Sequence, residues 1–255
     1  MKKLSTLLLA LVFISCAHQS GQDHLTMATL WAQKAGEAKA LSYQAFNIAK
    51  IELKKQLRRK NKKPLAIVVD VDETVLDNSP FQARGILTNT SYPDGWREWI
   101  DAAEAKPLPG AVDFLNYANK RGVAVFYITN RKQIGHEATI KNLLAVGFPV
   151  NPKHVMCRTN TSSKTERRDE VLKKYRIALL MGDNLGDFSE IFELNDVDKR
   201  NSLVDDNKNH FGSKFIVLPN AMYGNWEGAV YKGNFKQTGE EKRKVRYDAL
   251  VPFKL

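Results

Sequence analysis

The chain has 255 residues, of which 43% are hydrophobic and 26% charged, and its formal net charge is +11 at pH 7. This length and composition support one folded core, or one core with an insertion, and exclude a disordered chain or a fibre. Cys16 and Cys157 are the only cysteines, so the fold must rely on its core, and a cysteine cluster for zinc is excluded.

The N-terminal residues have the pattern of an export signal. Met1-Lys2-Lys3 is basic, and residues 4–14 form an apolar run that is too short to cross a membrane comfortably. The run 13–16 resembles the lipobox of bacterial lipoproteins. We therefore expect residues 1–15 to be a signal peptide and Cys16 to become a lipidated N-terminus that anchors the protein in a membrane. Ala17 favours the outer membrane, and plain secretion to the periplasm or beyond is the alternative.

A dense basic run covers residues 54–63, with seven Lys and Arg and no interleaved aromatic residue. Nucleic-acid binding usually combines such charges with aromatic side chains, so we expect no nucleic-acid polymer as partner. A solvated helix end and loop is the favoured interpretation. Contact with anionic headgroups, or steering of anionic substrates, remains an alternative.

Apolar residues recur at steps of three and four from Leu25 to about Leu57, without proline, which predicts helical structure. Five short apolar runs then predict buried strands, at 65–69, 123–128, 154–157, 177–181 and 215–218. Helical stretches are expected between them, at 110–121, 135–146, 164–175 and 188–194. This alternation predicts an α/β fold with a five-stranded parallel sheet covered by helices on both faces.

One long segment between the first strand and Pro107 interrupts the alternation and has no strand pattern. A segment of this length in a compact domain is more often a functional insertion than a plain connection. We expect it to form a helical cap with the N-terminal helix. The predicted division is a cap subdomain at 22–63 and 78–107 and a core at 64–77 and 108–255.

Polar side chains follow the predicted strands, and the carboxyl ends of parallel strands meet at one edge of a sheet, where ligands bind. They are Asp70, Asp72 and Thr74 after the first strand, Thr129, Asn130 and Arg131 after the second, Lys164 at the start of the helix after the third, and Asp183 and Asp187 after the fourth. Taken singly, each has an ordinary interpretation as a turn, a helix cap or a surface lysine. Their order along the chain favours one site, and clustered carboxylates favour Mg²⁺.

These residues carry a resemblance to a known family. Asp70-x-Asp72-x-Thr74, Thr129, Lys164 and Gly182-Asp183-x-x-x-Asp187 resemble the four motifs of the haloacid dehalogenase (HAD) superfamily. The longer runs 68–78 and 182–188 are similar to the signature pair of class C bacterial acid phosphatases, which include lipoprotein 5′-nucleotidases. The resemblance extends from about residue 31 to about residue 227, and it implies a Rossmann-like core with a smaller helical cap. Phe81 departs from the pattern, which often has tyrosine there.

The resemblance implies a role for each motif residue. Asp70 is expected to attack phosphorus and form an aspartyl-phosphate, and Asp72 to protonate the leaving alcohol and then activate water. Thr129 is expected to bind a phosphoryl oxygen, and Lys164 to offset negative charge.

The resemblance also implies a metal site. Asp70, the backbone carbonyl of Asp72 and the side chain of Asp183 are expected to hold Mg²⁺, with Asp187 behind them. Members of the superfamily that dehalogenate lack the second aspartate, so Asp72 favours phosphate chemistry.

The expected substrates are small phosphate monoesters, 5′-nucleotides among them, at mildly acidic pH. Trp96 and Tyr223 are candidates for stacking on a nucleobase, with packing in the cap or core as the alternative. Asn130 and Arg131 are candidates for contact with phosphate or ribose, on their position alone. The resemblance is also compatible with a homodimer, although the sequence locates no interface.

A binding protein is the competing hypothesis. A ligand-binding or storage lipoprotein on the same fold would bind without turnover, and such a protein is expected to lack the nucleophile. Asp70, Asp72, Lys164 and Asp183 are all present, so the enzyme is favoured.

Overall fold

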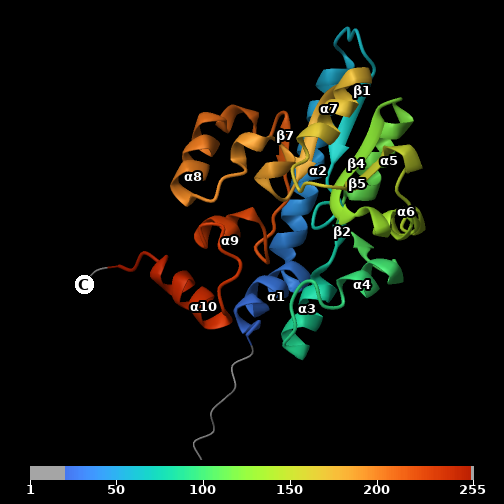
Figure 1. The fold of residues 1–255 in the computed structure, drawn as a ribbon. Coiled ribbons are helices and arrows are strands. Elements are labelled where there is room, and N and C mark those ends of the chain that lie inside the picture. Colours follow the sequence, from blue (N-terminus) through green and yellow to red (C-terminus); the bar gives the residue numbers. More distant parts are fainter. Residues whose placement is uncertain (1–20, 254–255) are drawn as a thin grey trace, which may run out of the picture.

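The computed structural model describes residues 21–253, so the predicted signal peptide at 1–15 and the lipidation of Cys16 lie outside the described residues. Strands and helices alternate along this part of the chain (Figure 1). The strands are β1 Leu65–Val69, β2 Leu76–Asp77, β3 Lys106–Pro107, β4 Ala124–Lys132, β5 Val155–Arg158, β6 Arg176–Gly182 and β7 Phe215–Val217. The helices are α1 Thr26–Lys34, α2 Gly36–Leu57, α3 Ser79–Thr88, α4 Trp96–Ala102, α5 Ala111–Lys120, α6 His136–Ala145, α7 Thr165–Lys174, α8 Val197–Asp206, α9 Asn225–Val230 and α10 Gly239–Asp248. Among residues 21–253, no helix combines the length and the apolar character that crossing a bilayer requires.

Five strands form one parallel sheet in the order β5-β4-β1-β6-β7, which confirms the predicted α/β fold. β1 lies at the centre, and its Val68 pairs with Phe126 of β4 and with Leu180 of β6. Each of the five apolar runs forms a strand of this sheet, and β4 extends further than expected, to Lys132. The central place of β1 puts the residue that follows it, Asp70, between the ends of β4 and β6.

Helices cover both faces of the sheet, and the side chains of β1 alternate between the two faces. Ile67 and Val69 share one hydrophobic core with α2, α5 and α6, whereas Ala66 and Val68 share another with α7 and α8. Burial on both sides explains why β1 is a continuous apolar run and not an alternating one.

The predicted helix at 188–194 is wrong. The segment has only a 3-10 turn at Glu190–Phe192, and Ser189 before it is extended, with φ −159° and ψ 149°. Phe188 and Phe192 are both buried in the core beneath α7 and α8. Seating these two rings against the sheet determines the backbone here, because so short a helix has little stability of its own.

The N-terminal helical region is two helices and not one. Ala35 between α1 and α2 is extended, with φ −76° and ψ 128°, and Gly36 begins α2. α1 packs against α3, whereas α2 packs along α5 and the sheet. The division into a cap at 22–63 and 78–107 and a core at 64–77 and 108–255 stays a prediction.

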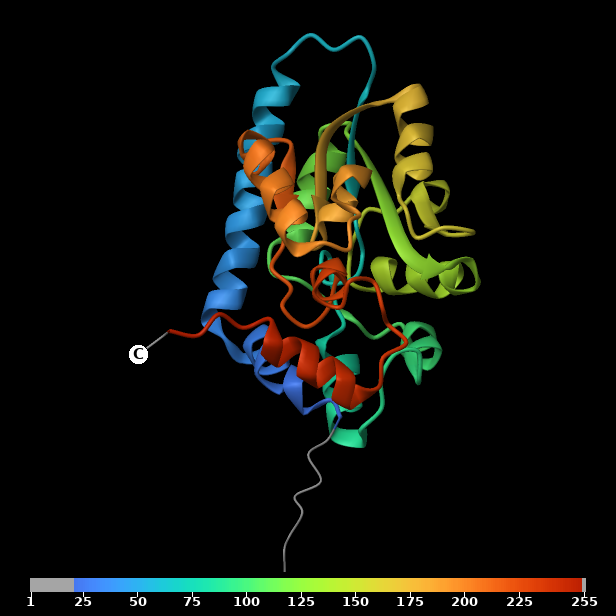
Figure 2. The ribbon, with the colours of Figure 1, turned by 60° about the vertical axis from the view of Figure 1, so that its left-hand side comes forward.

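The insertion begins and ends at a small ladder that the sequence did not predict. β2 and β3 are antiparallel and pair Leu76 with Pro107 and Asp77 with Lys106. Between them, α3 and α4 lie with α1 beyond the carboxyl edge of the sheet, and α10 crosses the same end (Figure 2). The insertion therefore lies beside the edge where the motif residues meet.

The packing of α2 on the sheet leads to a stability prediction. Leu53 is fully buried, so Leu53→Ala should lower the free energy of unfolding by about 2–5 kcal/mol through lost burial and a cavity. The matched control is Leu87→Ala on α3, whose side chain is 85% exposed and whose loss should cost less than about 0.5 kcal/mol. Denaturant titration measures both, and equal losses would contradict the packing described.

Candidate active site

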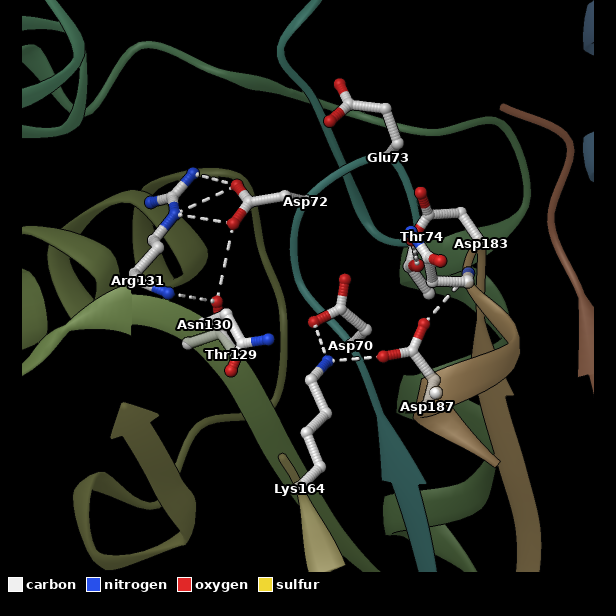
Figure 3. A network of polar contacts seen from close by, with 12 residues as sticks. Asp70, Asp72, Glu73, Thr74, Thr129, Asn130, Arg131, Lys164, Asp183 and Asp187 are labelled. Carbon is white, nitrogen blue, oxygen red and sulfur yellow. Dashed lines mark hydrogen bonds and ion pairs between the residues drawn. The ribbon is translucent and has the colours of Figure 1, made fainter. Parts of the chain in front are cut away.

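Four side chains from three separate parts of the sequence meet at the carboxyl edge of the sheet (Figure 3). Asp70 follows β1, and its backbone N–H donates to the carbonyl of Met181 on β6 at 2.9 Å. Asp183 follows β6, Asp187 ends the turn Leu185–Asp187, and Lys164 immediately precedes α7. The neighbouring ends of β1 and β6 thus bring the carboxylates together, and the start of α7 adds the lysine.

Lys164 bridges two of these carboxylates. Its Nζ donates to Asp70 Oδ1 and lies 2.6 Å from Asp187 Oδ1. Burial alone would lower the pKa of Lys164, but the carboxylates of Asp187 and Asp70 outweigh it and raise the pKa above its ordinary value. Lys164 is therefore cationic and holds Asp70 from one side.

The carboxylates of Asp70, Asp183 and Asp187 form a cluster in which one oxygen of each lies within 4.8 Å of the others. Burial raises the pKa of Asp70 to about 7, opposed by Lys164 and reinforced by Asp187 and Asp72. Burial, followed by repulsion from Asp187 and Asp70, also raises the pKa of Asp183 well above its usual range. One lysine therefore does not neutralise the cluster.

This donor set fits a hard divalent cation. Crowded carboxylate oxygens with too little positive charge nearby are the ligands that Mg²⁺ binds in proteins. Asp183 is held in place for this role, since its Oδ2 accepts from Asn220 Nδ2 at 2.8 Å and its Oδ1 lies 3.4 Å from Thr74 Oγ1. Asp187 Oδ2 accepts from the backbone N–H of Asn184 at 2.9 Å.

The side chain of Asp72 lies apart from this cluster. Its carboxylate faces Arg131, whose Nη2 lies 2.7 Å from Asp72 Oδ1 and whose Nε lies 2.9 Å from the same atom. Thr129 Oγ1 donates to Asp72 Oδ2 at 3.3 Å. Arg131 is almost fully buried, so the structure places it against Asp72 and not on an open surface. The two aspartates of the Asp-x-Asp motif thus have different cationic partners.

Asn130 is exposed, and its Oδ1 accepts from Arg167 Nη2 at 2.8 Å. Arg167 was not singled out from the sequence. Its guanidinium also donates to the carbonyls of Thr129 at 2.6 Å and Ser163 at 3.1 Å, which joins the end of β4 to the loop before Lys164. The available signal was its position three residues after Lys164, about one helical turn further along the chain.

The two candidate stacking residues contact different residues near the site. Trp96, at the start of α4, has the Arg131 guanidinium 5.7 Å from its ring centre and Phe81 edge-on at 4.9 Å. Tyr223 follows β7, and its hydroxyl donates to Glu73 Oε2. Both rings are partly buried.

Glu73 and Asn78 lie within the motif run 68–78, and the sequence predicted no role for either residue. Glu73 is buried with a left-handed backbone, φ 53°, and its Oε1 accepts from the Asn78 backbone N–H at 2.7 Å. Burial, followed by repulsion from Asp72 and Asp183, raises the pKa of Glu73 well above its usual range. The motif indicated that this run belongs to the site, but its spacing did not indicate the hydrogen-bond partners of the two residues.

The chain is similar to known acid phosphatases. A family model described as HAD superfamily, subfamily IIIB (Acid phosphatase), matches residues 12–226. The class B acid phosphatase of Xenorhabdus bovienii (strain SS-2004) is 27% identical over 144 residues, which cover 52% of this chain and 60% of that protein. That of Proteus mirabilis (strain HI4320) is 25% identical over 142 residues, with the same coverage. The chain thus spans less than two thirds of the length of these curated relatives.

Solved structures give a fuller match. The class C acid phosphatase from Bacillus anthracis superimposes with a TM-score of 0.90 at 46% identity, covering 92% of this chain and all of that one. A Bacillus anthracis class C structure with tungstate bound gives a TM-score of 0.89 at 47% identity, covering 91% and 99%. Both the sequence match and the fold confirm the family that the motifs indicated. The chain belongs to the acid phosphatases of the HAD superfamily, subfamily IIIB.

Proposed function

We propose that this protein is a Mg²⁺-dependent acid phosphatase that hydrolyses small phosphate monoesters, 5′-nucleotides among them, through an aspartyl-phosphate on Asp70. The observation that carries the proposal is the placement of Asp70. Its carboxylate is buried beside the Lys164 ammonium and next to Asp183 and Asp187, and Asp72 lies two residues further along the same loop. The tungstate in the Bacillus anthracis relative adds support, because tungstate is a tetrahedral oxyanion like phosphate.

In the first step, an oxygen of Asp70 attacks phosphorus and the ester P–O bond breaks. Asp72 gives its proton to the departing oxygen, and Arg131 and Thr129 hold the Asp72 carboxyl for this transfer. Lys164 offsets the charge that gathers on Asp70 and the phosphoryl oxygens. The products are the free alcohol and an aspartyl-phosphate.

In the second step, water attacks the phosphorus of the aspartyl-phosphate. Asp72 takes a proton from this water, and the bond between phosphorus and the Asp70 oxygen breaks to release inorganic phosphate. Asp70 returns to its starting state, and Asp72 is again protonated for the next substrate. The same carboxyl thus serves first as acid and then as base.

We propose that Mg²⁺ is held by the side chains of Asp70 and Asp183 and by the backbone carbonyl of Asp72. Asp187 forms an ion pair with Lys164 and so holds the ammonium next to this site. When bound, the ion supplies positive charge that favours the ionised form of these carboxylates and the charged phosphoryl group. Burial, reinforced by Asp187 and Asp72, raises the pKa of Asp70, so its ionised form needs more positive charge nearby than Lys164 supplies.

The nucleophile is tested by Asp70→Asn, which keeps the shape of the side chain and removes its nucleophilic oxygen. Turnover of p-nitrophenyl phosphate should fall by at least ~10³-fold, because covalent catalysis is lost. Asp113→Asn on the exposed face of α5 is the matched control and should keep full activity. Activity near wild type in a folded Asp70→Asn protein would disprove the assigned nucleophile.

Metal dependence is tested by dialysis against EDTA followed by titration with Mg²⁺. Activity should disappear and return, and Mg²⁺ should raise the melting temperature of the wild type, because it binds only the folded state. In Asp183→Asn the thermal shift should be lost or need far more Mg²⁺. Full activity of the EDTA-treated protein would exclude a required divalent metal.

Nucleotide preference is tested with Tyr223→Ala and two substrates, 5′-AMP and ribose 5-phosphate, which share a leaving group but differ in the base. Loss of about 1–3 kcal/mol of stacking should lower kcat/KM for 5′-AMP by ~5-fold to ~150-fold more than for ribose 5-phosphate. Tyr223→Phe keeps the ring and loses the hydroxyl contact with Glu73, so it should retain the preference. Equal losses on both substrates would remove Tyr223 from base recognition.

A further inference from the structure

Asn78 is fully buried beside the site, and both polar groups of its side chain have partners. Its Nδ2 donates to Asp72 Oδ1 at 2.9 Å and to Glu73 Oε2 at 3.2 Å. Its Oδ1 accepts from Trp99 Nε1 at 2.7 Å and lies 3.4 Å from Arg131 Nη2. One amide thus joins the Asp-x-Asp loop to helix α4 of the insertion.

The place of Asn78 in the chain would suit a different role. It is the residue before α3, a position where asparagine side chains commonly cap the helix. Here the side chain makes no capping hydrogen bond, and the Ser79 backbone N–H is satisfied by Asp77 Oδ1 at 2.8 Å. The Asn78 amide is therefore directed to the carboxylates and not to the helix.

Trp99 determines which end of the amide faces Asp72. An indole N–H can only donate, so the atom of Asn78 that faces Trp99 must be the carbonyl oxygen. The NH₂ group is then left to face Asp72 and Glu73, which accept. If the amide rotated, two donors would face each other at Trp99 and an oxygen would face two carboxylates, both unfavourable when buried.

The carboxyl of Asp72 is consequently held from three directions, by Arg131, Thr129 and Asn78. Arg131 and Asn78 share Oδ1, and Thr129 contacts Oδ2. A carboxyl that must give a proton to a leaving oxygen has to be aligned with it, and small displacements reduce the rate.

We propose that Asn78 is a positioning residue that aligns the Asp72 carboxyl for proton transfer to the leaving group, and that Trp99 fixes the orientation of the Asn78 amide. This proposal rests on the proposed function, in which Asp72 is the proton donor. It also makes the alignment of that donor depend on α4, an element of the insertion.

The test uses leaving groups that need the proton to different degrees. p-Nitrophenolate is stable without protonation, whereas the alkoxide from glycerol 2-phosphate is not, so poor alignment of the acid should affect mainly the alkyl ester. We expect Asn78→Ala in the Mg²⁺-loaded enzyme to lower kcat/KM by ~10-fold to ~100-fold for glycerol 2-phosphate and by less than ~3-fold for p-nitrophenyl phosphate. kcat/KM is the right quantity because it covers formation of the aspartyl-phosphate and not its hydrolysis.

Trp99→Phe is the second variant, since it keeps a ring and removes only the donor. It should show the same selective loss, to a smaller extent, and it carries the test alone if Asn78→Ala does not fold. Asp72→Asn gives the full size of the leaving-group effect. The matched control is Asn142→Ala, a buried asparagine that binds the backbone N–H and carbonyl of Ala105, at 3.2 Å and 2.9 Å, and makes no contact with Asp72.

The outcomes separate the two proposals. A selective loss for the alkyl ester in Asn78→Ala and Trp99→Phe, with Asn142→Ala unselective, supports the positioning role. Equal losses on both esters in folded variants, or no loss, overturn it while the phosphatase activity of the wild type stands. A wild-type protein that is folded and Mg²⁺-bound but hydrolyses neither ester overturns the proposed function itself.

Discussion

Repulsion between carboxylates is the constraint around which the rest of the site is arranged. Asp70, Asp183 and Asp187 lie at the ends of two adjacent strands, where burial makes each negative charge costly. Lys164 reduces this cost because α7 begins where its ammonium can reach Asp70 and Asp187 together. The position of α7 depends in turn on its packing against β4 and β6 in the second core. The packing of the core on this face of the sheet therefore determines where the Lys164 ammonium lies at the carboxyl edge.

A second cation, Arg131, offsets the negative charge of Asp72. Arg131 pairs with Asp72, whereas Lys164 pairs with Asp70. The two carboxyls of the Asp-x-Asp motif therefore have different cationic partners as well as different roles. Thr129 lies between the two groups and contacts Asp72 through its hydroxyl. This arrangement lets one carboxyl bind phosphorus while the other exchanges protons, because neither competes for the same positive charge.

The sheet could be predicted from the sequence because a strand buried on both faces leaves a continuous apolar run, and β1 is such a run. The meeting of Asp70, Lys164, Asp183 and Asp187 followed from the rule that parallel strands end at one edge. The 188–194 segment could not be predicted, since the seating of two phenylalanine rings on the sheet determines its backbone.

Long-range partners were equally invisible in the sequence. Position alone suggested that Arg131 contacts substrate, whereas its contact with Asp72 joins residues far apart in the chain. Asn78 belonged to a motif run, but the sequence predicted no role for it. Its partners depend on where α4 packs, which no periodicity in the insertion specifies. Sequence pattern thus located the residues that directly follow the strands, but not the long-range partners that orient them.

The ladder of β2 and β3 has a consequence for changes in the segment between these two strands. Because Asp77 and Lys106 are paired, the chain leaves and re-enters the core at a fixed point whatever lies between them. Closing a longer loop costs little, about 0.6 kcal/mol for each doubling of its length, so helices can be lengthened or exchanged there without moving the nucleophile. Two side chains of α4 are exceptions, because the Trp99 indole N–H donates to Asn78 and the Trp96 ring packs against the Arg131 guanidinium. An exchanged segment would have to supply a donor at the place of Trp99 and a ring at the place of Trp96, so changes in this segment stay coupled to the groups that hold Asp72.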